Sequence, residues 1–297
     1  MSANIAAPSF QRTSLTWLCY AVLGWYAYLQ GARDKEALGV FDELMKIQTV
    51  EPLSFVVAYS ATAIPARYAL ERRRWDEAAR LAVPQSDSGS GASAANFPLK
   101  SFPWQRFQWA VAHLHFARAI GAARSSDAAS ARHDAEKLSA IQQALVEVKG
   151  GYDWAKQVEI ARQVASAWVA YAEGKPEESL KLMRAAADLD DATDKHPVTP
   201  GAILPAREQL GELLLELKQP AAAMQEFEAS LQRAPNRFNG LYGAARGAKL
   251  AGDQKRATLY YGKLIELSRL ADSPRPEIAE AKAFLAGTNV RDSASAH

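Results

Sequence analysis

The segment REQLGELLLELKQPAAAMQEFEASLQRAP, residues 207–235, decides the fold. Its leucines recur in steps of three and four residues, which places them on one face of a helix: Leu210, Leu213, Leu214 and Leu217. The tripeptide KQP interrupts this pattern, and Pro220 suits the first position of a new helix because that position needs no backbone N–H. The segment therefore predicts two helices joined by a short turn.

Small side chains in the same segment indicate how the two helices meet. Gly211 lies on the first helix and Ala223 on the second, and antiparallel helices that cross closely need small residues at the crossing. Phe227 and Leu231 continue the apolar face of the second helix, and Pro235 ends it. We expect Gly211 and Ala223 to face each other.

The same plan recurs along the chain, so the fold is predicted to be all-α and built from stacked helix pairs. Further pairs are predicted over 24–47, 66–82, 166–189 and 241–267. Gly174 with Pro176, and Gly252 with Asp253, supply the turn and cap residues of two of them. Small residues again stand on each second helix: Ala37, Ala78, Ser179 and Ala257.

These units resemble tetratricopeptide repeats, which combine small crossing residues, a Gly or Asp turn, an aromatic residue on the second helix and a closing proline. Residues 207–235 match best and 241–267 next. The stretches QVEIARQVASAWVAY and APNRFNGLYGAARGAKLAGD also resemble the C-terminal half of large bacterial tetratricopeptide repeat proteins of unassigned function. The resemblance implies a right-handed solenoid of about six to seven helix pairs.

Composition limits the classes of function. The 297 residues are 48% apolar and 23% charged, with a net charge of +2, which is typical of a soluble globular protein. Such a small charge argues against a nucleic-acid partner. The single cysteine allows no disulfide within the chain. The apolar run 15–29 is too short to span a bilayer and lacks a cleavage site, so we expect no membrane span and a cytoplasmic protein.

The chain divides into five predicted parts. These are a disordered lead over 1–13, N-terminal helix pairs over 14–83, a flexible Phe/Pro-rich insertion over 84–103, a C-terminal solenoid over 104–287 and a disordered tail over 288–297. The run 15–29 predicts a helix buried on most sides. Its position near the start suggests an upstream helical region, or a second copy of the chain, as a packing partner.

A stack of helix pairs presents a concave surface formed by the first helix of each pair. Helical periodicity nominates eight residues for that surface: Trp168, Tyr171, Glu208, Glu212, Asn239, Tyr242, Arg246 and Lys249. This mixture of aromatic, acidic and basic side chains suits an extended peptide. The leading prediction is therefore a non-catalytic scaffold that binds a protein or peptide partner in its groove and needs no cofactor.

The connector over 192–204 is unusually long for adjacent helix pairs. It contains Pro197 and Pro200 and is followed directly by Pro205, and these three prolines restrict the backbone. It is either a rigid spacer, or a lip over the groove on which Lys195 and His196 face a ligand. The second reading leads to an alternative function: a small-molecule or metal-binding receptor, or an enzyme, whose pocket the connector closes together with the arm over 95–104.

No catalytic motif supports an enzyme directly. The chain has no metalloprotease H-E-x-x-H, no phosphate-binding glycine loop and no G-x-S-x-G. His113 and His115 lie two residues apart on a predicted helix and point to different faces, so they cannot bind one metal together. A scaffold predicts an open groove, whereas a receptor or enzyme predicts an enclosed pocket in which His113, His115 or His196 meets carboxylates.

Overall fold

The structure is a computed structural model that describes residues 15–47, 53–84, 99, 101–148, 151–196 and 201–295. Side chains are described from Val22 in the first helix and as far as Thr288 in the last. The predicted lead over 1–13, most of the insertion and the prolines at 197 and 200 lie outside the described residues.

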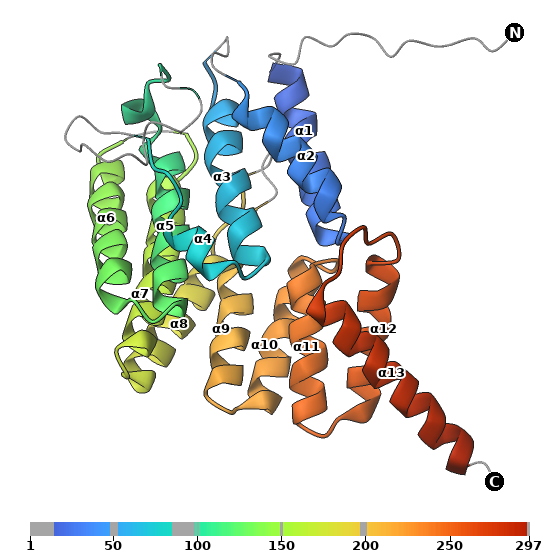
Figure 1. Cartoon of the computed structure of the whole chain (residues 1–297). Coiled ribbons are helices and arrows are strands. Elements are labelled where there is room, and N and C mark those ends of the chain that lie inside the picture. The colour runs from blue at the N-terminus through green and yellow to red at the C-terminus, as the bar shows by residue number, and fades with distance from the viewer. Residues whose placement is uncertain are drawn as a thin grey trace, which may run out of the picture.

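All regular elements among the described residues are helices, without a strand, so the all-α prediction is confirmed for them (Figure 1). The helices are α1 (Leu15–Gln30), α2 (Asp34–Met45), α3 (Phe55–Glu71), α4 (Trp75–Ala79), the 3₁₀ turn η2 (Trp104–Phe107), α5 (Gln108–Arg124), α6 (Ala128–Val146), α7 (Trp154–Ala172), α8 (Pro176–Asp191), α9 (Ala206–Glu216), α10 (Pro220–Arg233), α11 (Phe238–Leu250), α12 (Gln254–Leu267) and α13 (Pro276–Ser295).

Six consecutive pairs, from α1–α2 to α11–α12, share one turn geometry. In each turn one residue has a positive φ, between 54° and 82°: Ala32, Arg73, Ser126, Gly174, Lys218 and Gly252. The next residue donates its backbone N–H to the carbonyl five residues before it, at 2.8–2.9 Å: Arg33, Arg74, Asp127, Lys175, Gln219 and Asp253. This is the Schellman arrangement, which satisfies carbonyls left open at a helix C-terminus. The chain thus repeats one local structure six times.

A small residue follows each turn at the same position of the second helix, and all six are fully buried: Ala37, Ala78, Ala131, Ser179, Ala223 and Ala257. Pro176 and Pro220 begin their helices as predicted, and Asp253 caps α12 by accepting the Arg256 N–H at 2.9 Å. Gly211 does approach α10, but its nearest neighbour is the ring of Phe227 and not Ala223. The ring, not a second small residue, fills the space that the glycine leaves.

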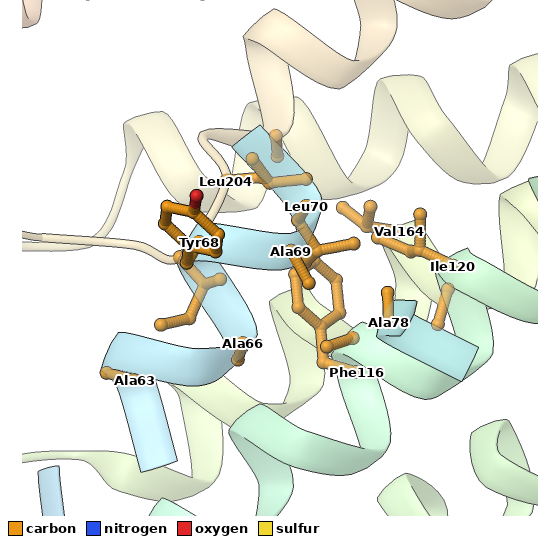
Figure 2. Packing of buried hydrophobic residues seen from close by; sticks show 14 of the residues in the cluster. Ala63, Ala66, Tyr68, Ala69, Leu70, Ala78, Phe116, Ile120, Val164 and Leu204 are labelled. Carbon is orange, nitrogen blue, oxygen red and sulfur yellow. The ribbon is translucent and has the colours of Figure 1, made fainter. Parts of the chain in front are cut away.

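Helices on both sides of the insertion share one hydrophobic core. Figure 2 shows part of this core, in which Leu70 of α3, Phe116 of α5, Val164 of α7 and Leu204 of the connector gather in one cluster. In the described part of the insertion, Phe102 and Trp104 are buried and their rings lie 4.7 Å apart. The described end of the Phe/Pro-rich arm therefore lies against the helices.

The first helix pair also contacts the far end of the chain (Figure 1). The Arg275 guanidinium donates to the buried Asp34 carboxylate, with Nε to Oδ2 at 3.0 Å. The Asp272 carboxylate accepts the backbone N–H of Lys35, at 3.0 Å to Oδ2. These bonds join the N-terminus of α2 to the segment between α12 and α13, so the stack closes on itself.

The two terminal helices differ from the sequence expectations. Of the described α1 side chains, Val22, Trp25 and Leu29 are buried, whereas Leu23 is 51% exposed, so this helix is buried on one side only. α13 continues to Ser295, into the stretch for which disorder is expected, because no proline interrupts its hydrogen bonding. No described helix is long and apolar enough to cross a bilayer.

Candidate ligand-binding pocket

Two helices supply most of the side chains around one pocket at the centre of the stack. α5 contributes Trp109, His113 and Phe116, whose spacing of four and three residues places them on one face. α7 faces it with Trp154 and Ala161 among others. Asp153 fixes the start of α7 by accepting the Lys156 N–H at 2.9 Å, and so holds Trp154 at the first helical position.

The connector forms another wall of this pocket through Lys195, His196 and residues 201–204. One tyrosine and one arginine side chain hold the described ends of the connector by hydrogen bonds. Tyr152 donates its hydroxyl to the Asp194 carbonyl at 2.7 Å. The buried Arg67 donates Nη2 to the carbonyls of Gly201 and Ala202 at 2.9 and 2.6 Å. The two described ends of the connector are thereby bonded to α3 and to the residue that precedes α7 by two positions.

Aromatic rings dominate the pocket lining. Trp109 and Trp154 are stacked with centroids 3.8 Å apart and planes 12° apart. The His196 ring lies 5.4 Å from that of Trp154 at 19°, and the edge of Tyr152 meets both of these rings. The space among these side chains measures about 690 Å³ when the open solvent at its mouth is included.

His113 places a polar ring on the wall of the pocket that faces α3. Its Nδ1 lies 3.0 Å from Oγ1 of Thr62 on α3. Burial, with a smaller contribution from the positive charge of Arg67, lowers the pKa of His113 to about 3. The imidazole is therefore neutral at physiological pH. Its ring meets Tyr59 and Trp109 edge to face, at 5.4 and 5.9 Å.

Burial shifts two further groups at the pocket. It lowers the pKa of His196 below its usual value and raises the pKa of Tyr152 to about 12. Both groups are thus held in their neutral forms. Lys195 is the one charged residue among the described lining residues, and no carboxylate lines the pocket there. The pocket is apolar, aromatic and free of negative charge.

The eight predicted groove residues are placed differently from the expectation of an open surface. Four are buried, namely Trp168, Glu208, Asn239 and Tyr242. Each is bound by this chain itself: Trp168 donates to Gln209 at 2.9 Å, Glu208 pairs with Arg237, Asn239 donates to the Glu71 carbonyl at 3.2 Å, and Tyr242 donates to Glu280 at 2.6 Å.

The C-terminal end of α3 and the turn after it cover part of this surface. Glu71 and Arg73 lie against α9 and α11, where Arg73 forms an ion pair with Glu212. A small hollow remains beside α9, with a volume of about 350 Å³ when open solvent is included. Four of the predicted residues line it: Trp168, Glu208, Glu212 and Asn239. In this structure the expected groove is covered by the N-terminal helices.

The other predicted residues lie nearer the surface. Lys249 is exposed and donates to Glu280 at 2.9 Å. The Arg246 guanidinium lies 5.7 Å from the Tyr242 ring, and the Tyr171 ring meets Trp168 at 5.8 Å. Lys195 and His196 do line a pocket, but it is the aromatic pocket between α5 and α7 and not the concave groove.

The histidines separate as their spacing predicts. His115 points away from the pocket and bonds the buried Asp134 carboxylate at 2.7 Å, beside Arg118. His113 and His196 meet aromatic rings instead of the carboxylates that the receptor hypothesis expects. In the described residues no three His, Cys, Asp or Glu side chains are grouped as metal ligands.

A wider depression lies on the other side of the tryptophan stack. Its volume is about 1,720 Å³ with open solvent included, and it extends between the start of α5, the end of α6 and the start of α7. Trp109, Tyr152 and Trp154 line both hollows. Val146 and Val148, which are 58% and 66% exposed, lie at its rim.

Sequence reasoning did not nominate Tyr59, Trp109, Tyr152 or Trp154. The signal that could have found two of them is GGYDW, residues 150–154, in which two aromatic residues flank a helix cap directly after a glycine turn. Tyr59 and Trp109 carry no such signal, because aromatic residues at helical spacing are usual in any helix core. No protein-family model, curated protein or solved structure matches this chain.

Proposed function

We propose that this chain is a non-catalytic binding protein that takes a small ligand with a flat apolar part into the aromatic pocket. The observation that carries the proposal is the pocket itself. His113 from α5, His196 from the connector and the stacked Trp109 and Trp154 line one common pocket. Flat rings bind well between such side chains, because offset stacking adds to the burial of apolar area.

The proposal keeps the architecture expected from the resemblance, a solenoid of tetratricopeptide type. Its support is the repeated turn and the six buried small residues. The ligand, however, is proposed to bind between helices and not along a concave groove. Fixed contacts to the connector from Arg67 and Tyr152 favour a pre-formed pocket, which loses little entropy on binding.

The test is calorimetric titration with indole as the probe. Wild-type protein is expected to bind it, with NMR shifts at the indole N–H groups of Trp109 and Trp154. Ala161→Phe fills the pocket from α7 and should weaken binding at least tenfold. Ala129→Phe, at an exposed position of α6, is the matched control and should bind as wild type does.

Equal binding by the wild type and by both variants would contradict the proposal. Trp154→Ala provides a second route if Ala161→Phe melts at a lower temperature than the control. It removes half of the ring stack and does not add bulk, and it should also weaken indole binding.

A second candidate is the predicted scaffold, in a changed location. The exposed Val146 and Val148 beside the wide depression favour an apolar peptide as its occupant, because exposed apolar side chains around a hollow are typical of binding sites. Val146→Glu with Val148→Glu should abolish capture of such a peptide from a display library and leave indole binding unchanged. Retained peptide binding in that variant would dispose of this candidate.

A further inference from the structure

The hydrogen bonds of Thr62 fix the tautomer of His113. The Thr62 hydroxyl has one proton, and it donates that proton to the Ala58 carbonyl within α3, at 2.9 Å. Its oxygen must then accept from His113, whose Nδ1 lies 3.0 Å away. Nδ1 therefore carries the ring proton, and Nε2 has a free lone pair.

The Nε2 lone pair lies at the edge of the His113 ring that faces away from Thr62. Since His113 lines the pocket and Nδ1 is turned to α3, the edge with Nε2 is the one left for the cavity. Within the described residues, Thr62 is the only hydrogen-bond partner found for this imidazole. A ligand that offers a proton donor to this side of the pocket would form a hydrogen bond with that acceptor.

The charges around the pocket act against cations. A buried cation needs a counter-charge to offset its lost hydration, and the described lining contains no carboxylate. Cation–π attraction could compensate in an open aromatic cage. Here, however, Trp109 and Trp154 cover one face of each other at 3.8 Å. The positive charge of Arg67, close enough to act on His113, opposes a cation further.

We infer that the pocket selects a flat, neutral or anionic ligand with an N–H or O–H group that donates to Nε2 of His113, and that it discriminates against organic cations. This inference rests on the proposed function, and it adds the class of ligand. Recognition of a donor by a buried acceptor gives stronger discrimination than a difference in apolar size.

Three probes that share one ring system test it by calorimetry: indole, 1-methylindole and tryptamine. Indole is expected to bind about tenfold more tightly than 1-methylindole, which lacks the donor. A purely apolar pocket would show the reverse order, because the methyl group adds apolar surface. Tryptamine, a cation at neutral pH, is expected to bind more weakly than indole.

The variant His113→Phe keeps an aromatic ring and removes the acceptor. It should bind indole and 1-methylindole with equal affinity, and measurable binding of both probes shows that the pocket remains folded. If 1-methylindole or tryptamine binds wild-type protein as tightly as indole, or if the preference survives in His113→Phe, the inference is wrong and the proposed function stands. If none of the three probes binds, the proposed function fails as well.

Discussion

Arg237 and Glu208 form a buried bidentate ion pair, with Nε to Oε2 and Nη2 to Oε1 both at 2.9 Å. The same guanidinium donates through Nη1 to Glu71 of α3 at 3.0 Å. One arginine at the start of α11 thus joins α9 to α3. Burial alone would lower the pKa of Arg237, but the negative charges of Glu208 and Glu71 raise it by more. The pKa therefore lies well above its ordinary value, and the guanidinium stays charged.

Removal of this arginine should be costly. Arg237→Met leaves Glu71 and Glu208 buried without their main partner, and such losses cost about 3–5 kcal/mol of the free energy of unfolding. Urea denaturation measures the change. The matched control is Arg269→Met, because Arg269 and its partner Glu266 are exposed; it should change stability by less than about 0.5 kcal/mol. Equal losses of stability in the two variants would mean that the buried ion pair does not stabilise the contact between α3 and α9.

The glycine at 243 should not tolerate a methyl group. A Cβ there would lie 2.3 Å from ring atoms of Phe227, so Gly243→Ala should destabilise the fold by about 1–3 kcal/mol through overpacking. Gly262→Ala, where a Cβ meets nothing within 4 Å, should stabilise α12 by about 0.5–1 kcal/mol. Thermal melts of both variants measure the contrast.

The shorter side chain in Phe227→Leu provides the internal check. In that background Gly243→Ala should cost much less than it does alone, because the ring atoms that it would strike are gone. An additive double mutant would show that the cost of Gly243→Ala has another origin.

The repeated turn predicts opposite effects at two equivalent positions. Lys218 has a φ of 59° and Gly174 a φ of 75°, and side chains other than glycine are strained in this region. Lys218→Gly should therefore raise the free energy of unfolding by about 0.5–1 kcal/mol, and Gly174→Ala should lower it by about the same amount. Chemical denaturation decides this; changes of the same sign in both variants would contradict a shared turn geometry.

The lowered pKa of His113 makes stability depend on pH. In the unfolded chain a histidine titrates near 6.5, whereas folded His113 does so at about 3. Below pH 6.5 the unfolded chain therefore takes up a proton that the folded chain refuses, and stability falls by up to about 1.4 kcal/mol per pH unit. We expect a loss of about 2 kcal/mol between pH 6.5 and pH 5 from this group.

His113→Phe isolates this contribution. Its stability should change less between pH 7 and pH 5 than that of the wild type. Carboxylates with lowered pKa values, such as Asp34 and Glu280, lose their contribution below this window because they protonate at lower pH. Parallel pH profiles for the wild type and the variant would show that His113 is not the group responsible.

Local features of the fold were predictable from the sequence because they depend on neighbours in the chain. Helical spacing of leucines, Pro220 at a helix start and Asp253 as a cap each involve a few consecutive residues. The turn at Lys218 was located by KQP, although its positive φ at a lysine gives no sequence signal.

The burial of the expected groove could not be predicted in the same way. It depends on Glu71 meeting Arg237, 166 residues further along the chain, and periodicity gives only the face of a helix and not what covers it. The pocket was predictable in part. His113 and His196 were named from the sequence as candidate pocket residues. Trp109 and Trp154 follow ordinary helical spacing, and only the structure shows that they stack beside a pocket.

The contact between Asp34 and Arg275 changes how the molecule should respond to force. Open arrays of helix pairs can fray, since a terminal unit touches only one neighbour and detaches without disturbing the others. Here Asp34, at the start of α2, binds Arg275, which is 241 residues further along the chain. Neither the first nor the last helix pair can therefore unfold without breaking this contact. Force applied to the two ends of the chain would act first on the Asp34–Arg275 ion pair. Once that ion pair breaks, the helix pairs should unfold together in one cooperative step.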